Sequence, residues 1–303
     1  MKPATDTLLA NPFKSSAVLD YVELTKPGIT MLVLSSMVIG FILGSTAGIQ
    51  FGILAHAVIG TLLIAAGTAA HNQYIERDLD KLMLRTSTRP LPAQKIAPNK
   101  ALFFSLTLMF SGLIYLSFMV NLAAGVVSGI TTLLYLGLYT PLKRVSFANV
   151  WVGSIPGALP PVGGWAAATG NVADPGMWVL FGIVFLWQIP HVIAIAWLCN
   201  EDYTRAGFRM LPKYDKNGMK SAVAIFVCLF LILPVSGLLY YLGINGWVYL
   251  TGAVVAGIYF LYFGIRFARQ RDKVNAKKLM FGSLVYLPLV WVFVILDRLA
   301  SLL

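Results

Sequence analysis

The sequence predicts an all-α protein that crosses a membrane several times, and three observations support this prediction. Of the 303 residues, 58% are hydrophobic and only 12% are charged, and the mean hydropathy is +0.78, which is typical of a chain whose solvent is lipid. Apolar runs of about 20 residues, the length that crosses a bilayer, recur from Gly28 to Leu299. The runs are apolar on all sides, whereas the strands of a membrane barrel alternate over about ten residues.

Nine such runs follow one another, so we expect nine transmembrane helices after an N-terminal arm over residues 1–27. The expected helices cover residues 28–47, 52–78, 101–120, 122–140, 149–168, 176–199, 219–241, 246–266 and 278–299. The second continues from its apolar part into a charged stretch that only Pro90 and Pro92 clearly stop. The fifth contains IPGALPPVGGW, which is expected to interrupt or bend it. No linker separates the runs, so residues 28–303 are predicted to form one domain.

Lysine and arginine gather in alternate loops. They occur in the N-terminal arm and after the second, fourth, sixth and eighth expected helices, with Arg298 as the exception. The positive-inside rule places these loops and the N-terminus in the cytoplasm and the C-terminus outside. The first 27 residues resemble neither a signal peptide nor a transit peptide, which favours multi-pass insertion into a cell inner (plasma) membrane. Anionic lipid next to the basic face accounts for the net charge of +11, and no nucleic-acid partner is expected.

The charged end of the second expected helix carries three polar side chains on one flank. Asn72, Glu76 and Asp80 are spaced i, i+4 and i+8, which turns each by about 40° from the last. Two carboxylates and an amide oxygen are hard ligands of the kind that Mg²⁺ uses together with phosphate oxygens. The alternative is a helix end with local salt bridges such as Glu76 to Lys81. The cost of carboxylates at the mouth of a membrane bundle favours the metal site, and Asp78 is expected to point off this flank.

A second acidic pair, Glu201 and Asp202, closes the sixth expected helix on the same membrane face. Two acidic clusters with arginines nearby predict a metal-bridged diphosphate, in which cations meet the remaining phosphate charge. Asp202 is expected to ligate the metal, and Glu201 is the less direct candidate. Tyr139 and Lys143 end the fourth expected helix and share one side if the helix continues through Pro141, although ordinary basic anchoring is the alternative. The expected diphosphate-binding cations are Arg85, Arg89, Lys143 and Arg144.

These motifs carry a resemblance to a known family. The pattern Asn72-x-x-x-Glu76-x-x-x-Asp80, followed by Arg85-Thr86 and Arg89-Pro90, resembles the first aspartate-rich motif of the UbiA superfamily of intramembrane prenyltransferases. Tyr139-x-x-x-Lys143 resembles its tyrosine–lysine motif, and the likeness extends over nearly the whole chain. More specifically, LTKPG, NVWVGSIPGALPPVGGW, WQIPH and DYTRAGFRMLP resemble the haem-farnesylating branch. Glu76 stands where many relatives have Asp, and Val192 replaces an expected aromatic residue.

The resemblance implies a nine-helix bundle with a lateral, lipid-facing cavity. It implies an enzyme that transfers a farnesyl group from farnesyl diphosphate to a vinyl group of haem b (protohaem IX), with Mg²⁺ and with addition of water, giving haem O. The protein partners implied are haem A synthase or assembly factors of terminal oxidases. Ionisation of an allylic diphosphate needs cations around the departing anion. Tyr139 is a candidate cation–π partner of the allylic cation, with an interfacial tyrosine as the alternative.

His191 lies eleven residues before Asp202, on nearly the same helical face and about 16 Å deeper by helix rise. Imidazole is a natural axial ligand of haem iron, but it also forms hydrogen bonds between membrane helices, and both interpretations stay open. His71, Cys199 and Cys228 are expected to pack inside the bundle.

Two other function classes remain open. A UbiA-type enzyme acting on an aromatic quinone precursor is expected to show a second DxxxD spacing, whereas this chain has Glu201-Asp202-Tyr203 followed by Ala206. A secondary transporter is expected to carry charged or broken segments at the bilayer midplane, whereas the acids here cluster at one face.

Overall fold

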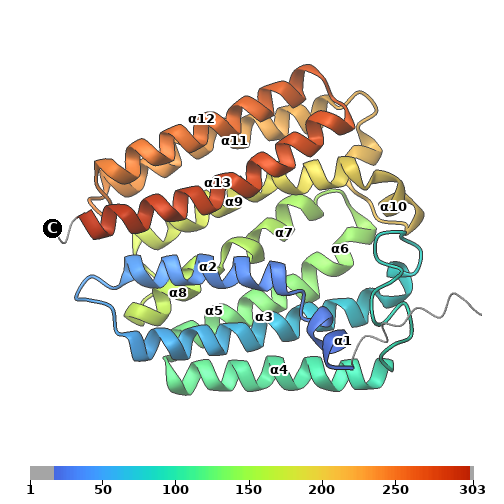
Figure 1. The fold of residues 1–303 in the computed structure, drawn as a ribbon, viewed down its shortest axis with the longest axis horizontal. Coiled ribbons are helices and arrows are strands. Elements are labelled where there is room, and N and C mark those ends of the chain that lie inside the picture. Colours follow the sequence, from blue (N-terminus) through green and yellow to red (C-terminus); the bar gives the residue numbers. More distant parts are fainter. Residues whose placement is uncertain (1–16, 301–303) are drawn as a thin grey trace, which may run out of the picture.

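The computed structural model describes residues 17–300, which form a bundle of long helices lying roughly side by side (Figure 1). Two of its helices are not α-helices: η1, Leu134–Tyr139, is a π-helix, and η2, Leu211–Tyr214, is a 3₁₀-helix. The helices are α1 Ala17–Leu24, α2 Pro27–Gly44, α3 Phe51–Asp80, α4 Pro98–Met119, α5 Leu122–Leu133, η1 Leu134–Tyr139, α6 Thr140–Val145, α7 Asn149–Ala158, α8 Pro160–Thr169, α9 Pro175–Leu198, α10 Asn200–Arg205, η2 Leu211–Tyr214, α11 Met219–Tyr241, α12 Trp247–Arg269 and α13 Lys273–Ala300.

Eight continuous helical segments in the described range are long and apolar enough to cross a membrane, with α5, η1 and α6 counted as one. The predicted all-α, multi-spanning fold is confirmed. The predicted count of nine is approximate, because the fifth expected span consists of α7 and α8, of 10 residues each, which meet at Leu159. Pro160 has no backbone N–H to continue the ladder, so the expected interruption falls inside IPGALPPVGGW.

Small residues let α8 lie directly against α2. A Cβ at Gly40 of α2 would overlap the carbonyl oxygen of Pro161, and a Cβ at Gly164 of α8 would overlap that of Met37. Such close backbone approach is how membrane helices associate without a hydrophobic driving force between them. The largest buried cluster lies mainly among α9, α11, α12 and α13, whereas α2, α3, α5, α7 and α8 leave a cavity between them.

The basic segments meet at one end of the bundle. Arg209 donates its backbone N–H to the Lys143 carbonyl at 2.7 Å, which joins the segment before η2 to α6. The Lys273 ammonium of α13 bonds to Glu201 of α10 at 2.7 Å. Arg298, the exception in the charge pattern, instead donates to the Ser45 carbonyl at 3.0 Å, at the far end of α2.

Candidate active site

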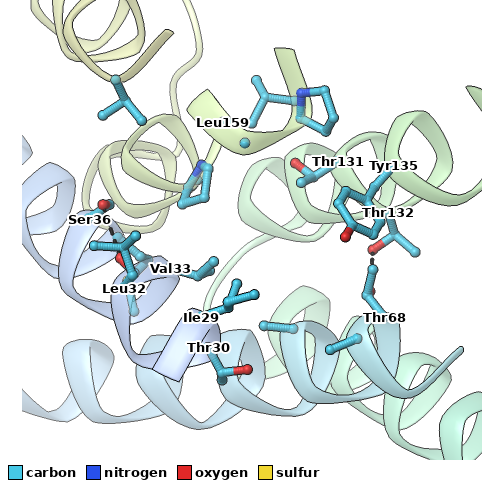
Figure 2. Close-up of a pocket in the computed structure, with 18 of the residues that line it drawn as sticks. Ile29, Thr30, Leu32, Val33, Ser36, Thr68, Thr131, Thr132, Tyr135 and Leu159 are labelled. Atoms are coloured by element: carbon cyan, nitrogen blue, oxygen red, sulfur yellow. Dashed lines mark hydrogen bonds between the residues drawn. The ribbon is translucent and has the colours of Figure 1, made fainter. Parts of the chain in front are cut away.

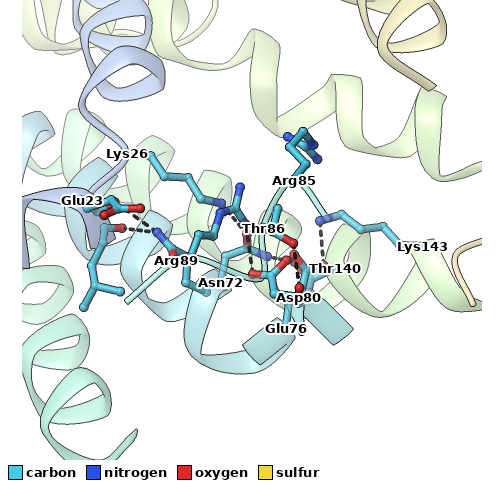
Figure 3. A network of polar contacts seen from close by, with 12 residues as sticks. Glu23, Lys26, Asn72, Glu76, Asp80, Arg85, Thr86, Arg89, Thr140 and Lys143 are labelled. Carbon is cyan, nitrogen blue, oxygen red and sulfur yellow. Dashed lines mark hydrogen bonds and ion pairs between the residues drawn. The ribbon is translucent and has the colours of Figure 1, made fainter. Parts of the chain in front are cut away.

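The last turns of α3 carry the predicted polar flank. Asn72, Glu76 and Asp80 are buried, with exposed fractions of 1%, 6% and 1%, and they come from successive turns of one helix. Each accepts a hydrogen bond from a cation on a different segment (Figure 3): Lys26 Nζ to Asn72 Oδ1 at 2.9 Å, Lys143 Nζ to Glu76 Oε1 at 2.8 Å, and Arg89 to Asp80 Oδ2 at 2.9 Å. These three contacts therefore join the end of α3 to the start of α2, to α6 and to the segment that follows α3.

The local salt bridges considered as the alternative lie elsewhere on α3. Lys81 pairs with the exposed Asp78 at 3.1 Å, and Arg77 lies 3.7 Å from the same carboxylate. Asp78 thus lies apart from the flank, as expected from its helical position.

Asp80 is the residue whose surroundings best fit a metal ion. Its Oδ2 faces Arg89, whereas Oδ1 is buried and accepts no hydrogen bond from any residue that the structure describes. An unsatisfied buried carboxylate oxygen is costly, and a hard cation would satisfy it. Over residues 17–300 no three His, Cys, Asp or Glu side chains form a metal-binding group by themselves. The donors fit an ion such as Mg²⁺, which takes one or two carboxylates and completes its shell with phosphate oxygens and water.

Lys26 is a member of the site that the sequence interpretation missed. It lies at the N-cap of α2 with φ of 47°, in the left-handed region, just before Pro27. Strained backbone of this kind gathers at functional sites. Loss of hydration, with smaller effects of Arg89 and Lys143, lowers the pKa of Lys26 to about 7. A lysine directly before the Pro27-Gly28 start of a helix was the one sequence feature that pointed to Lys26. The partner of this lysine, Asn72, is 46 residues away, so no local pattern indicated their contact.

A π-helical turn places Tyr139 and Lys143 together. In η1 the Thr140 N–H donates to the Tyr135 carbonyl, five residues back, and the Thr140 hydroxyl bonds to the same oxygen at 2.9 Å. The helix therefore continues through Pro141, which supplies no N–H. Lys143 Nζ lies 4.6 Å from the centre of the Tyr139 ring, so the predicted shared side is confirmed.

An apolar cavity of about 270 Å³ begins at this polar end. Lys26 and Tyr139 line it there. The walls come from α2, α3, α5, η1, α7, α8 and α9 and are mostly apolar, and Figure 2 shows Ile29 and Val33 of α2 among the lining side chains. Thr68 and Thr132 contact each other at 3.3 Å across one wall. Lys26 thus joins the polar flank to the apolar interior of the cavity, and Tyr139 joins the cavity to Lys143.

Glu201 and Asp202, the second acidic pair, contact different parts of the protein. Asp202 accepts from the backbone N–H groups of Leu84 and Arg85, both at 3.2 Å, and from Arg205 at 3.0 Å. It therefore fastens α10 to the turn that follows α3. Glu201 is exposed and pairs with Lys273, whose hydrogen bond lowers the pKa of Glu201.

The predicted cations are also divided. Arg89 and Lys143 belong to the polar flank. Arg85 is exposed, 3.4 Å from the Tyr203 hydroxyl, and its guanidinium lies 5.8 Å from that ring. Tyr203 is a neighbour that the sequence interpretation missed, and burial raises its pKa. Arg144 is exposed, and no described contact joins it to the flank.

His191 of α9 contacts α13. Its Nδ1 is 2.6 Å from the Ser283 hydroxyl, and its ring stacks on Trp187 with centres 5.3 Å apart. Trp187 in turn donates to the Ser283 carbonyl at 2.7 Å. His191 is not among the described residues that line the cavity, so this arrangement matches the interhelical alternative. His71 likewise bonds across to Ser105 of α4 at 3.0 Å.

Fold and site together define a membrane-spanning helical protein with buried polar and charged side chains next to an apolar cavity. The chain belongs to the UbiA prenyltransferase family, whose sequence pattern matches residues 33–285.

Individual relatives narrow the comparison. The chain is 44% identical over 288 residues to the protoheme IX farnesyltransferase of Solibacter usitatus, covering 92% of this chain and 98% of that protein. It is 38% identical over 292 residues to the protein of the same name from Opitutus terrae, covering 95% and 97%.

Among solved structures, a digeranylgeranylglyceryl phosphate synthase superposes with a TM-score of 0.76 at 23% identity, covering 93% of this chain and 98% of that one. A UbiA homologue from Archaeoglobus fulgidus bound to GPP and Mg²⁺ gives a TM-score of 0.66 at 13% identity, covering 91% and 99%. These two likenesses establish a shared fold.

Proposed function

We propose that this protein transfers the farnesyl group of farnesyl diphosphate to a vinyl group of haem b, with addition of water, to give haem O. The observation that carries the proposal is the likeness to protoheme IX farnesyltransferases over more than nine-tenths of both chains. The cations around the polar flank and the apolar cavity next to them support it, because the substrate has a diphosphate head and an apolar tail.

The diphosphate binds at the polar end of the cavity. Lys26, Arg89 and Lys143 surround the α3 flank, and Arg85 lies on the adjoining turn. Ionisation moves negative charge onto the leaving diphosphate, so preformed cations in this poorly hydrated place stabilise the transition state more than the ground state. Arg144 is a more remote candidate, because its side chain is exposed.

The acids of the flank are the metal ligands in this proposal. Asp80, with its free Oδ1, leads, and Asn72 and Glu76 support it. Asp202 is a candidate for a second ion at the adjoining turn, and Glu201 is a weaker one because it faces Lys273. Mg²⁺ held by these groups would neutralise charge that develops on the diphosphate oxygens.

The Tyr139 ring stabilises the allylic cation that remains on the farnesyl group after ionisation. The ring lies 4.6 Å from Lys143 Nζ and also lines the cavity, where the electron-rich face can stabilise the allylic cation. The apolar walls keep bulk water away from the allylic cation until the vinyl carbon attacks C1 of the farnesyl group. No general base is needed to begin, because departure of the diphosphate generates the electrophile.

The setting of the reaction follows from the charge pattern. The basic segments meet at one end, and the positive-inside rule puts that end, with the N-terminus, in the cytoplasm and the C-terminus outside. A cell inner membrane is the proposed location. Haem A synthase and terminal oxidase assembly factors are the protein partners to test.

A product assay tests the proposal. Purified protein is incubated with haem b, farnesyl diphosphate and Mg²⁺, and the haems are analysed by mass spectrometry. The proposal predicts a haem heavier by a farnesyl group plus water. Absence of that product together with prenylation of 4-hydroxybenzoate would assign the protein to the quinone-precursor enzymes.

A further inference from the structure

Gln188 places a carboxamide in the wall of the apolar cavity. Its Nε2 group donates to the carbonyl oxygens of Ser154 at 3.0 Å and Val184 at 3.2 Å. Only the NH₂ end of a carboxamide can face two carbonyl oxygens, so these bonds leave Oε1 as the outward end. Oε1 accepts no hydrogen bond from residues 17–300 and keeps some accessible surface, and Gln188 lines the cavity. It is an oriented acceptor in apolar surroundings.

Two glycines of α7 locate this oxygen relative to Tyr139. A Cβ at Gly153 would overlap the Tyr139 ring, and a Cβ at Gly157 would overlap Gln188 Oε1. The two glycines are four residues apart, hence about 6 Å along one face of the helix. Because α7 begins at Asn149, which bonds to the basic segment before η2, Gln188 lies one turn deeper than Tyr139.

The proposed reaction needs a hydrogen-bond acceptor at that depth. When C1 of the farnesyl group bonds to the terminal vinyl carbon, the C1–oxygen bond has broken with its electron pair on the diphosphate, and the positive charge passes to the adjacent haem side-chain carbon. A water lone pair then forms the new carbon–oxygen bond, and the released proton is taken by the diphosphate. If no water is in place, loss of a neighbouring proton leaves an alkene without the hydroxyl group.

We propose that Gln188 Oε1 binds this water and holds it next to the second cation, so that Gln188 sets the ratio of hydroxylated to dehydrated product. Water in an apolar cavity is retained only where polar partners are available. The missing side chain of Gly157 lets the Gln188 carboxamide pack against α7, because a Cβ at Gly157 would overlap Oε1. The inference rests on the proposed function, because it assumes that haem is farnesylated in this cavity.

The test compares product ratios in two variants that act on the same oxygen. Gln188→Met removes the acceptor at similar volume, and Gly157→Ala puts a methyl group against it. Both are expected to lower the ratio of hydroxylated haem to the product lighter by one water by about three- to tenfold, the range that one hydrogen bond gives. Gly163→Ala is the matched control with a wild-type ratio, because a Cβ there would meet only ordinary contacts at 3.7 and 4.0 Å.

The outcomes separate the two proposals. A wild-type ratio in Gln188→Met overturns the role of Gln188, while the farnesyltransferase proposal stands. If Gln188→Met makes no farnesylated haem at all, the ratio in Gly157→Ala decides. A wild-type protein that makes neither product overturns the proposed function itself.

Discussion

The ion pair between Lys143 and Glu76 can be used to separate a structural effect from a catalytic one. The Nζ–Oε1 distance is 2.8 Å, and the exposed fractions of the side chains are 13% and 8%. Exposed pairs contribute at most about 1 kcal/mol, whereas removing one partner of a buried pair costs about 3–5 kcal/mol. With slight exposure on both sides, Lys143→Met should lower the free energy of unfolding by about 2–3 kcal/mol.

The double variant Glu76→Gln/Lys143→Met supplies the decisive comparison. It leaves no unpaired buried charge, so thermal denaturation in detergent should show most of the lost stability restored. Farnesyl transfer should stay about 10²–10³-fold below wild type, because the Lys143 cation that meets the leaving diphosphate and the Glu76 carboxylate that supports the metal are both missing. The reasoning is refuted if the double variant is no more stable than Lys143→Met, or if activity returns together with stability.

Three further outcomes are expected. Asp202→Ala should raise the KM for farnesyl diphosphate about tenfold by releasing the turn that carries Arg85, the effect of losing one charge-assisted hydrogen bond. An unchanged KM would contradict this anchoring role, and a raised Mg²⁺ requirement would support the second-ion role proposed for Asp202. Gly153→Ala should displace the Tyr139 ring at a cost of about 1–3 kcal/mol and lower kcat; wild-type kcat would remove Tyr139 from the reaction. His191→Ala should lower the melting temperature, because its hydrogen bond to α13 is lost, and leave the Soret band of bound haem in place; a shifted band would establish haem ligation.

The sequence predicted those parts of the site that lie along one helix. Asn72, Glu76 and Asp80 were placed on one flank by helical periodicity alone, and the structure buries all three. The same reasoning joined Tyr139 to Lys143, because the π-turn carries the helix past Pro141. Periodicity is a local property, so it can be read without knowing how the bundle folds.

Helical periodicity could not predict contacts between segments that are distant in the sequence. Lys26 looked like an ordinary basic residue, and only the left-handed turn before α2 brings it to Asn72. Glu201 and Asp202 are neighbours in sequence, yet one faces Lys273 and the other the amides of Leu84 and Arg85. Where α10 docks depends on packing among distant helices, which no local pattern contains.

The division of the fifth span shows the same limit. The prolines and glycines of IPGALPPVGGW predicted an interruption, and α7 and α8 do meet there at Leu159. The role of the glycines could not be predicted, because it depends on side chains of other helices. The Tyr139 ring packs against Gly153 and the Gln188 carboxamide against Gly157, where a Cβ would overlap them.

The central claim is that Asn72, Glu76 and Asp80 of α3, together with the neighbouring cations, bind a metal-bound diphosphate. A ligand-binding measurement tests this claim most directly. A farnesyl diphosphate analogue that cannot ionise is titrated into the purified protein with and without Mg²⁺, using wild type and Asp80→Asn. The account predicts Mg²⁺-dependent binding in wild type and loss of that dependence in Asp80→Asn, whose carboxamide is a far weaker ligand. Equal, Mg²⁺-dependent affinity in both proteins would contradict it.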